Sequence, residues 1–178
     1  MTLTAGYDVG GAHLKVALVE SGRVVAVRQI ACPLWLGLDQ LGTALDEAKA
    51  ITAGATRHAL TMTGELTEIF PSRQAGVVSL VAFLAQRLGP AARFFMGLKG
   101  FGEAATASTD PDTVASANFI ATAQLIAAKR KGALLIDFGS TTTDIIVCDR
   151  PQGLTDAERL QTGELVYTGF TRTPVPDR

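Results

Sequence analysis

The sequence has little cysteine, few aromatic residues and no excess of positive charge. Its two cysteines, Cys32 and Cys148, are far apart and form no C-x-x-C motif, which argues against a zinc ribbon or a disulfide framework. We expect both thiols to be reduced and buried. The formal net charge is −1, so neither nucleic acid nor an anionic membrane surface is an expected partner.

Long apolar runs and leader sequences are also missing. The first residues lack a basic segment followed by an apolar one, and no apolar stretch approaches the roughly 20 residues that span a bilayer. The cytoplasm is therefore the expected location. With 178 residues, 47% of them hydrophobic, the chain is long enough to bury a sizeable core.

Glycine turns between apolar runs predict an antiparallel start to the sheet. Residues 7–9, 14–19 and 24–30 are apolar or β-branched, and Gly10-Gly11 and Ser21-Gly22 separate them. A helix over 38–51, a strand at 58–62, a helix over 77–88 and a strand at 93–96 then predict β-α-β units with parallel strands.

The second half of the sequence alternates in the same way. Asp110-Pro111 begins an alanine-rich stretch, for which the pattern predicts one long helix over 114–130 that ends before Gly132. Residues 133–138 predict a buried strand and 144–148 another strand. A short helix at 155–160 is expected to follow.

The strongest signal is a repeated strand, turn and strand. Residues 8–19 read Asp-Val-Gly-Gly-Ala-His-Leu-Lys-Val-Ala-Leu-Val, and residues 137–148 read Asp-Phe-Gly-Ser-Thr-Thr-Thr-Asp-Ile-Ile-Val-Cys, at a constant offset of 129 positions. Such a repeat implies two pseudo-equivalent halves. When such halves pack face to face, both aspartate turns point into the cleft between them.

The residue types of the repeat suit a phosphate group held with Mg²⁺. Mg²⁺ is usually bound by one or two carboxylates, waters and substrate phosphate oxygens. Small residues beside a carboxylate let backbone N–H groups approach an anion closely. In the simpler alternative, each aspartate only caps its own turn. The predicted metal ligands are Asp8 and Asp137, and the predicted phosphate-binding residues are Gly10, Gly11, Gly139, Ser140, Thr141 and Thr142.

Four further residues stand out from their surroundings. Lys15 lies in an apolar strand and needs a counter-charge such as phosphate, unless its side chain extends to solvent at the strand edge. Glu65 follows a strand end, where α/β sheets usually place site residues, or simply begins a helix. Asn118 is either a site-facing amide or a core polar group. His13 is interpreted as a turn residue and not as a metal ligand.

At these residues the sequence resembles the actin-like ATPase superfamily of sugar kinases, heat-shock ATPases and acetate kinases. The loop at 137–144 also resembles that of hydantoinase and oxoprolinase proteins. A closer resemblance is to the methylofuran-biosynthesis synthase family, often described as tetrahydromethanopterin-linked one-carbon-transfer proteins. The segments that carry it are residues 8–15, 61–66, 70–73, 115–118 and 159–169.

The resemblance implies an actin-like, ribonuclease H-like α/β fold and an enzyme that joins a furan to a phenol. The implied substrates are an aminomethylfuran carrying a pyrophosphate and a phenol derived from tyramine or tyrosine, which displaces the pyrophosphate to form an aryl ether. Glu65 would then be the base toward the phenol. Asp8, Lys15, Glu65 and Asp137 are the catalytic candidates, and Asn118, Glu164 and Tyr167 are the substrate-binding candidates.

The resemblance also bears on domains and partners. Family members are longer, and the superfamily's nucleotide-binding glycine loop lies in a C-terminal part that this sequence lacks. We expect a first subdomain at 1–131 and the incomplete start of a second at 132–178. A homo-oligomer or a second chain that completes the cleft is an open hypothesis. So are two other functions: ATP-dependent chemistry of the hydantoinase, oxoprolinase or kinase kind, and a non-catalytic ligand-sensing or assembly module.

Overall fold

The computed structural model describes residues 2–139 and 142–170. Contacts within the chain divide it into unit 1, Met1–Asn118, and unit 2, Phe119–Arg178. This division falls at the start of helix α5 (Asn118–Lys129), whereas the boundary expected at residue 131 lies after that helix. In the described part of the chain, no helix is long and apolar enough to cross a membrane.

Unit 1 begins with the predicted antiparallel meander. Strand β1 (Leu3–Val9) pairs with β2 (His13–Glu20), which pairs with β3 (Arg23–Ala31). The turn between β2 and β3 uses Ser21 and Gly22, both with positive φ (48° and 81°). Such turns match the right-handed twist of the strands that they join. The predicted antiparallel opening is confirmed.

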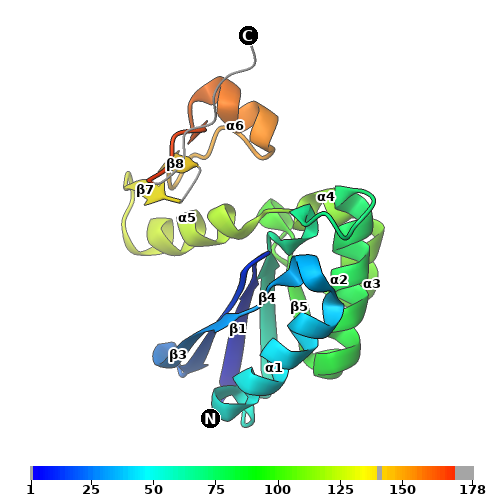
Figure 1. Ribbon diagram of the computed structural model, residues 1–178. Helices are drawn as coiled ribbons and strands as arrows, with labels where there is room; N and C mark the ends of the chain where they lie inside the picture. The colour runs from blue at the N-terminus through cyan, green and yellow to red at the C-terminus, as the bar shows by residue number, and fades with distance from the viewer. Residues whose placement is uncertain (1, 140–141, 171–178) are drawn as a thin grey trace. The chain divides into compact units, whose positions relative to one another are not determined.

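The sheet continues with parallel strands. Strand β4 (Arg57–Met62) lies parallel to β1, and β5 (Ala92–Phe95) lies parallel to β4, with the short β6 (Phe101–Gly102) antiparallel at the edge. The strand order is β3-β2-β1-β4-β5-β6, as Figure 1 shows in part. This mixed sheet confirms the α/β class and agrees with the actin-like fold predicted from the sequence.

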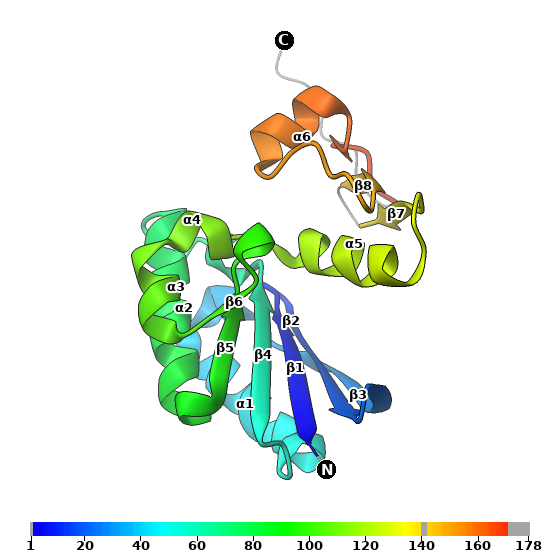
Figure 2. The ribbon, with the colours of Figure 1, turned by 180° about the vertical axis from the view of Figure 1, so that it is seen from behind.

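Helices α1 (Leu38–Thr52) and α2 (Arg73–Leu88) pack on one face of this sheet (Figure 1), and α3 (Ala104–Thr109) follows β6. Figure 2 shows the strands from the other face. Period-2 alternation in β1 buries Ala5, Tyr7 and Val9 under the helices. Asp8 therefore lies on the opposite face. Single 3-10 turns occupy Leu34–Leu36, Gly64–Leu66, Gly89–Ala91 and Gly97–Lys99.

The single long helix predicted over 114–130 is wrong. Helix α4 (Pro111–Val114) ends early, and α5 begins only at Asn118. Between them, Ala115 forms a parallel bridge to Met62, and Ser116 takes a left-handed conformation with φ of 50°. Alanine-rich sequence favours a helix by a few tenths of a kcal/mol per residue, and tertiary contacts at these positions override that preference.

Unit 2 contains a small antiparallel sheet. Its strands are β7 (Leu134–Phe138), β8 (Thr143–Val147) and β9 (Leu165–Val166), in the order β7-β8-β9. Helix α6 (Asp156–Thr162) begins with a capping box between Thr155 and Glu158. The two strands and the short helix predicted for this region are all present.

The burial predicted for β7 is wrong, although the predicted burial of both cysteines is confirmed. Leu134, Ile136 and Phe138 are exposed, because β7 is an edge strand of the three-stranded sheet and one of its faces carries no cover among the described residues of unit 2. Cys32 and Cys148 are buried and free.

Candidate active site

The two repeated segments form hairpins with the same register. In the β1–β2 hairpin, Asp8 pairs across the strands with Lys15. In the β7–β8 hairpin, Asp137 pairs with Asp144. The sequence offset therefore corresponds to a structural repeat in which each aspartate is the penultimate residue of its strand.

Each of the two turns also contains an equivalent backbone hydrogen bond. Gly10 N donates to His13 O at 3.0 Å, and Gly139 N donates to Thr142 O at 2.8 Å. A Cβ atom at either glycine would lie within about 3.1 Å of that same acceptor oxygen, 3.0 Å for Gly10 and 3.1 Å for Gly139. Both turns therefore favour glycine. Ser140 and Thr141, the other predicted phosphate-binding residues of the second turn, lie outside the described residues.

Asp8 is held by its neighbours on the face of the sheet opposite helices α1 and α2. Its Oδ2 lies 3.2 Å from Lys15 Nζ, and its Oδ1 accepts a hydrogen bond from Thr61 Oγ1 at 3.3 Å. Lys15 keeps 60% of its side chain exposed. The counter-charge that Lys15 needs is thus Asp8 itself, and its ammonium group remains accessible to an anion.

The first turn lies beside the loop that follows β4. Thr63 N donates to Val9 O at 2.9 Å, and a Cβ atom on Gly11 would lie 3.0 Å from Thr67 Cγ2. Leu34 N donates to Gly11 O at 2.9 Å and holds the turn from its other side. The carboxyl ends of β1 and β4 therefore meet, at the edge where open α/β sheets bind ligands.

Glu65, in this second loop, is fully buried. Its Oε1 accepts a hydrogen bond from Ser116 Oγ at 2.7 Å and lies 3.8 Å from Arg73 Nε. Helix α2 packs directly on its backbone, since a Cβ atom on Gly76 would lie 2.7 Å from Glu65 O. Glu65 is therefore a fixed, water-excluded carboxylate at the carboxyl edge of the sheet, and the prediction that it acts as a base is untested.

In unit 2, the charge at the second hairpin is balanced differently. Asp144 forms an ion pair with the buried Arg159, which also lies 3.5 Å from Asp156 and places its guanidinium 3.7 Å over the Phe119 ring. Burial raises the pKa of Asp144 above its ordinary value, although Arg159 acts in the opposite direction, and the charge of Asp137 adds to the rise.

The three predicted substrate-binding residues have different environments. Asn118 is the first residue of α5 and half-buried. Glu164 is buried, and its carboxylate accepts hydrogen bonds from Gln152 N and Gly153 N at 2.8–2.9 Å, so it fixes a loop of unit 2. Tyr167 is exposed. Their roles toward a substrate remain predictions.

Reasoning from single residues missed Arg73 and Arg159. Both lie in segments that resemble the synthase family, 70–73 and 159–169. Neither has a local pattern that marks it, because each contacts a carboxylate from a distant part of the sequence. The resemblance was the signal that could have found them.

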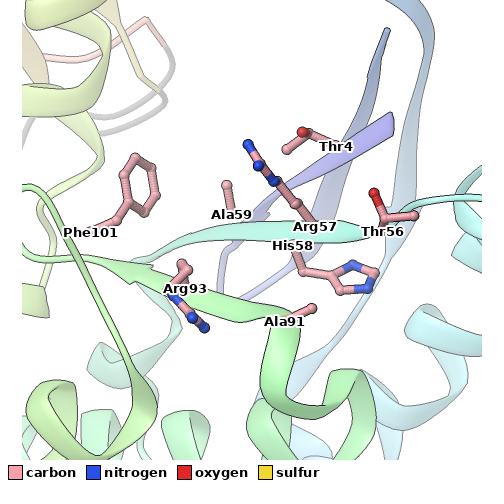
Figure 3. Close-up of a pocket in the computed structure, with 8 residues that line it drawn as sticks. All are labelled: Thr4, Thr56, Arg57, His58, Ala59, Ala91, Arg93 and Phe101. Carbon is pink, nitrogen blue, oxygen red and sulfur yellow. The ribbon is translucent and has the colours of Figure 1, made fainter. Parts of the chain in front are cut away.

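A hollow of about 600 Å³ lies elsewhere in unit 1, at the starts of β1 and β4 and not at their carboxyl ends. In Figure 3 the Arg57 side chain extends beside Thr4. The hollow is thus at the opposite end of the strands from Asp8 and Glu65. Its lining residues are Thr4, Thr56, Arg57, His58, Ala59, Ala91, Arg93 and Phe101.

Comparison with curated proteins gives two relatives of one kind. The chain is 32% identical over 174 residues to the (4-{4-[2-(gamma-L-glutamylamino)ethyl]phenoxymethyl}furan-2-yl)methanamine synthase of Methanocaldococcus jannaschii, covering 96% of this chain and 52% of the relative. It is 50% identical over 48 residues to the synthase of the same name from Methanococcus vannielii, covering 25% of this chain and 22% of the relative. The chain is a homologue of these synthases. It spans about half the length of the first of them.

Solved structures of low sequence identity are also similar. A Ppx/GppA family member from Aquifex aeolicus matches with a TM-score of 0.48 and 14% identity, over 82% of this chain and 46% of its own. A ROK family glucokinase from Streptomyces griseus matches with a TM-score of 0.48 and 18% identity, over 85% of this chain and 46% of its own. No protein-family model matches the chain. The fold assignment rests on the strand order of unit 1.

The donor chemistry at the two hairpins fits Mg²⁺, the metal predicted from the residue types of the repeat. Within residues 2–139 and 142–170, one side-chain group donates to each oxygen of Asp8, which leaves spare lone pairs, and Asp137 is exposed. Among the described residues, no group of three or more His, Cys, Asp or Glu side chains could hold a metal alone. Mg²⁺ usually keeps waters and phosphate oxygens as ligands and does not require such a group.

Proposed function

We propose that the chain is a Mg²⁺-dependent transferase of methylofuran biosynthesis, which condenses a furanylmethyl pyrophosphate with a phenol of the tyramine type and releases pyrophosphate. The observation that carries the proposal is the homology over 96% of the chain, a span that includes both hairpins. The relative's name contains a phenoxymethyl group on a furan, which is an aryl ether of this kind.

In the proposed reaction, the phenol loses its proton to Glu65, and the phenolate oxygen forms a bond to the furanylmethyl carbon. The bond between that carbon and the pyrophosphate oxygen breaks, and its electron pair leaves with the pyrophosphate. A free phenol has a pKa near 10, so a positioned base is needed near neutral pH. The buried carboxylate of Glu65 supplies one within unit 1.

The pyrophosphate leaving group requires stabilisation of negative charge. Negative charge builds on the pyrophosphate oxygens, and cationic or N–H groups aimed at those oxygens lower the barrier. Lys15, beside Asp8, supplies an exposed ammonium group at the first turn. Asp8 and Asp137 would hold Mg²⁺, which when bound neutralises pyrophosphate charge.

The test is to incubate the purified chain with Mg²⁺, the furanylmethyl pyrophosphate and gamma-glutamyltyramine. We expect the aryl ether by mass spectrometry and one pyrophosphate released per ether formed. Hydrolysis of ATP without ether formation would instead support the amide-activating or kinase alternative. Binding of Mg²⁺-pyrophosphate or Mg²⁺-ATP without any turnover would support the non-catalytic module. Light scattering on the same sample measures whether the chain forms a homo-oligomer.

A further inference from the structure

Among the described residues, two buried polar atoms of the Glu65–Arg73 ion pair in unit 1 have no hydrogen-bond partner. They are Glu65 Oε2, an acceptor, and Arg73 Nε, a donor. Arg73 Nε lies 3.8 Å from the other carboxylate oxygen, Glu65 Oε1. The separation is too long for a hydrogen bond. The ion pair therefore leaves one carboxylate oxygen and one N–H group without a partner.

This arrangement is costly for the folded chain. A buried carboxylate must be compensated by hydrogen bonds, and each buried polar atom left without one costs about 1–3 kcal/mol. Ser116, which donates to Oε1, is held at φ of 50°, a conformation that costs a non-glycine residue about 1–2 kcal/mol. Backbone strain and unsatisfied polar groups cluster at functional sites more than elsewhere.

A hydroxyl group is the chemical complement of this pair of atoms. It can donate one hydrogen bond to Glu65 Oε2 and accept another from Arg73 Nε. Arg73 keeps 32% of its side chain exposed, so it connects the buried carboxylate with the surface. In the segment between these two residues, Leu66 and Ile69 are exposed apolar side chains, which suit an aromatic ring attached to that hydroxyl.

We propose that Glu65 and Arg73 bind the phenolic hydroxyl of the acceptor. This inference rests on the proposed function. The phenol O–H donates to Glu65 Oε2, which takes the proton when the oxygen attacks the furanylmethyl carbon. Arg73 Nε–H donates to the same oxygen and stabilises it as a phenolate. Arg73 is thereby a further catalytic residue, which acts on the same oxygen as Glu65.

Ser116 is the positioning residue of this site. Its hydroxyl donates a hydrogen bond to Glu65 Oε1, which leaves Oε2 for the phenolic substrate. Gly76 allows α2 to pack closely on the Glu65 backbone, since a Cβ atom there would lie 2.7 Å from Glu65 O. The carboxylate is thus fixed from two elements, Ser116 before α5 and Gly76 in α2.

The experiment compares the binding of tyramine and 2-phenylethylamine, which differ only in the hydroxyl, to the purified chain by calorimetry. We expect the wild type to bind tyramine at least about tenfold more tightly, because a site built for a hydroxyl leaves its polar groups unpaired when the hydroxyl is missing. Glu65→Gln and Arg73→Gln should each bring the ratio close to one. Arg87→Gln is the matched control, since Arg87 lies on the same helix with 33% of its side chain exposed.

Ser116→Gly separates the hydroxyl from the strained backbone, since glycine adopts positive φ freely. It should lower the preference for tyramine severalfold without lowering the melting temperature by more than a few degrees. If Glu65→Gln does not fold, Ser116→Gly and Arg73→Gln still test the site.

The outcomes separate the site from the proposed function. A wild type that binds neither amine, or both equally, overturns the site. A preference that survives in Glu65→Gln and Arg73→Gln overturns it too, and if ether still forms, the proposed function stands alone. A preference that depends on both residues, in a chain that forms no ether, supports the hydroxyl site and counts against the proposed function.

Discussion

The β1–β2 and β7–β8 hairpins have the same backbone arrangement and differ in the charges that surround their aspartates. Both have the same register and the same turn hydrogen bond. In the first, Asp8 faces an exposed cation on the next strand. In the second, Asp137 lies opposite another carboxylate, Asp144. Asp144 in turn forms an ion pair with the buried Arg159 of α6. A repeated backbone can therefore present two different charge patterns.

The surroundings of the hairpins explain this difference. Strand β1 is flanked by β2 and β4 in a six-stranded sheet, and its ion pair is partly solvated, with 60% of the Lys15 side chain and 26% of the Asp8 side chain exposed. In the second hairpin, Asp144 keeps 22% of its side chain exposed and its partner Arg159 only 5%, so this pair is largely shielded from solvent and each charge needs the other. The degree of burial decides how much each charge contributes to stability. Five predictions test this comparison.

The largest effect is expected for Arg159→Met. Removing one partner of a buried ion pair leaves Asp144 uncompensated and costs about 3–5 kcal/mol. Hydrogen exchange measured over β8 and α6 should show faster exchange in the variant. Unit 1 is the internal control and should exchange as in the wild type. Unchanged protection in β8 would mean that the ion pair contributes nothing to unit 2.

Asp8→Asn and Asp137→Asn should each lower turnover of the proposed reaction by about a hundredfold or more, as the loss of single electrostatic stabilisers does in other enzymes. Asp39→Asn, an exposed aspartate that bonds Gln40, is the control. The measurement is kcat with Mg²⁺ varied. If both variants kept full turnover and an unchanged Mg²⁺ requirement, the assignment of these aspartates would be wrong.

Asp144 should make the stability of unit 2 dependent on pH. Because burial raises its pKa, the folded chain binds this proton more tightly than the unfolded chain. The contribution to stability is complete below the ordinary value of 3.8 and is lost as pH rises through the raised pKa. Each pKa unit of difference between the two states corresponds to about 1.4 kcal/mol.

Urea unfolding at pH 4 and pH 7 should therefore show the wild type losing stability relative to Asp144→Asn as the pH rises. If the wild type instead gained stability relative to Asp144→Asn over this pH range, attraction to Arg159 would outweigh burial and lower the pKa of Asp144.

Gly10→Ala and Gly139→Ala should have similar effects, about 1–2 kcal/mol each, because the added Cβ meets an equivalent carbonyl oxygen at nearly the same distance. Thermal unfolding measures both variants. Gly22, where a Cβ would contact nothing within 4 Å but φ is 81°, offers a control for backbone strain alone. A large difference between the two turn variants would show that the turns are not equivalent.

The smallest effect on stability is expected for Lys15→Met. Exposed ion pairs contribute about 0–1 kcal/mol, and Lys15 keeps most of its side chain in solvent. Chemical denaturation should place the variant within that range of the wild type. Affinity for Mg²⁺-pyrophosphate should fall at the same time if Lys15 contacts the leaving group, and unchanged affinity would remove Lys15 from the proposed site.

Local patterns determined a large part of the fold. Glycine turns between apolar runs gave the meander and both hairpins, and the offset of 129 positions identified the repeat before any contact was known. These features depend on neighbours a few residues apart, so hydrogen-bond register and side-chain alternation can be derived from the sequence. The position of Glu65 at a strand end followed in the same way.

Only the tertiary structure decided which residues surround that carboxylate. The alanine-rich sequence indicates a helix through Ser116, yet its hydroxyl reaches Glu65, 51 positions earlier. Arg73 and Arg159 likewise gained their partners only when distant segments packed together. Such contacts depend on which segments the packed core brings side by side, and local propensities of a few tenths of a kcal/mol are too small to oppose them.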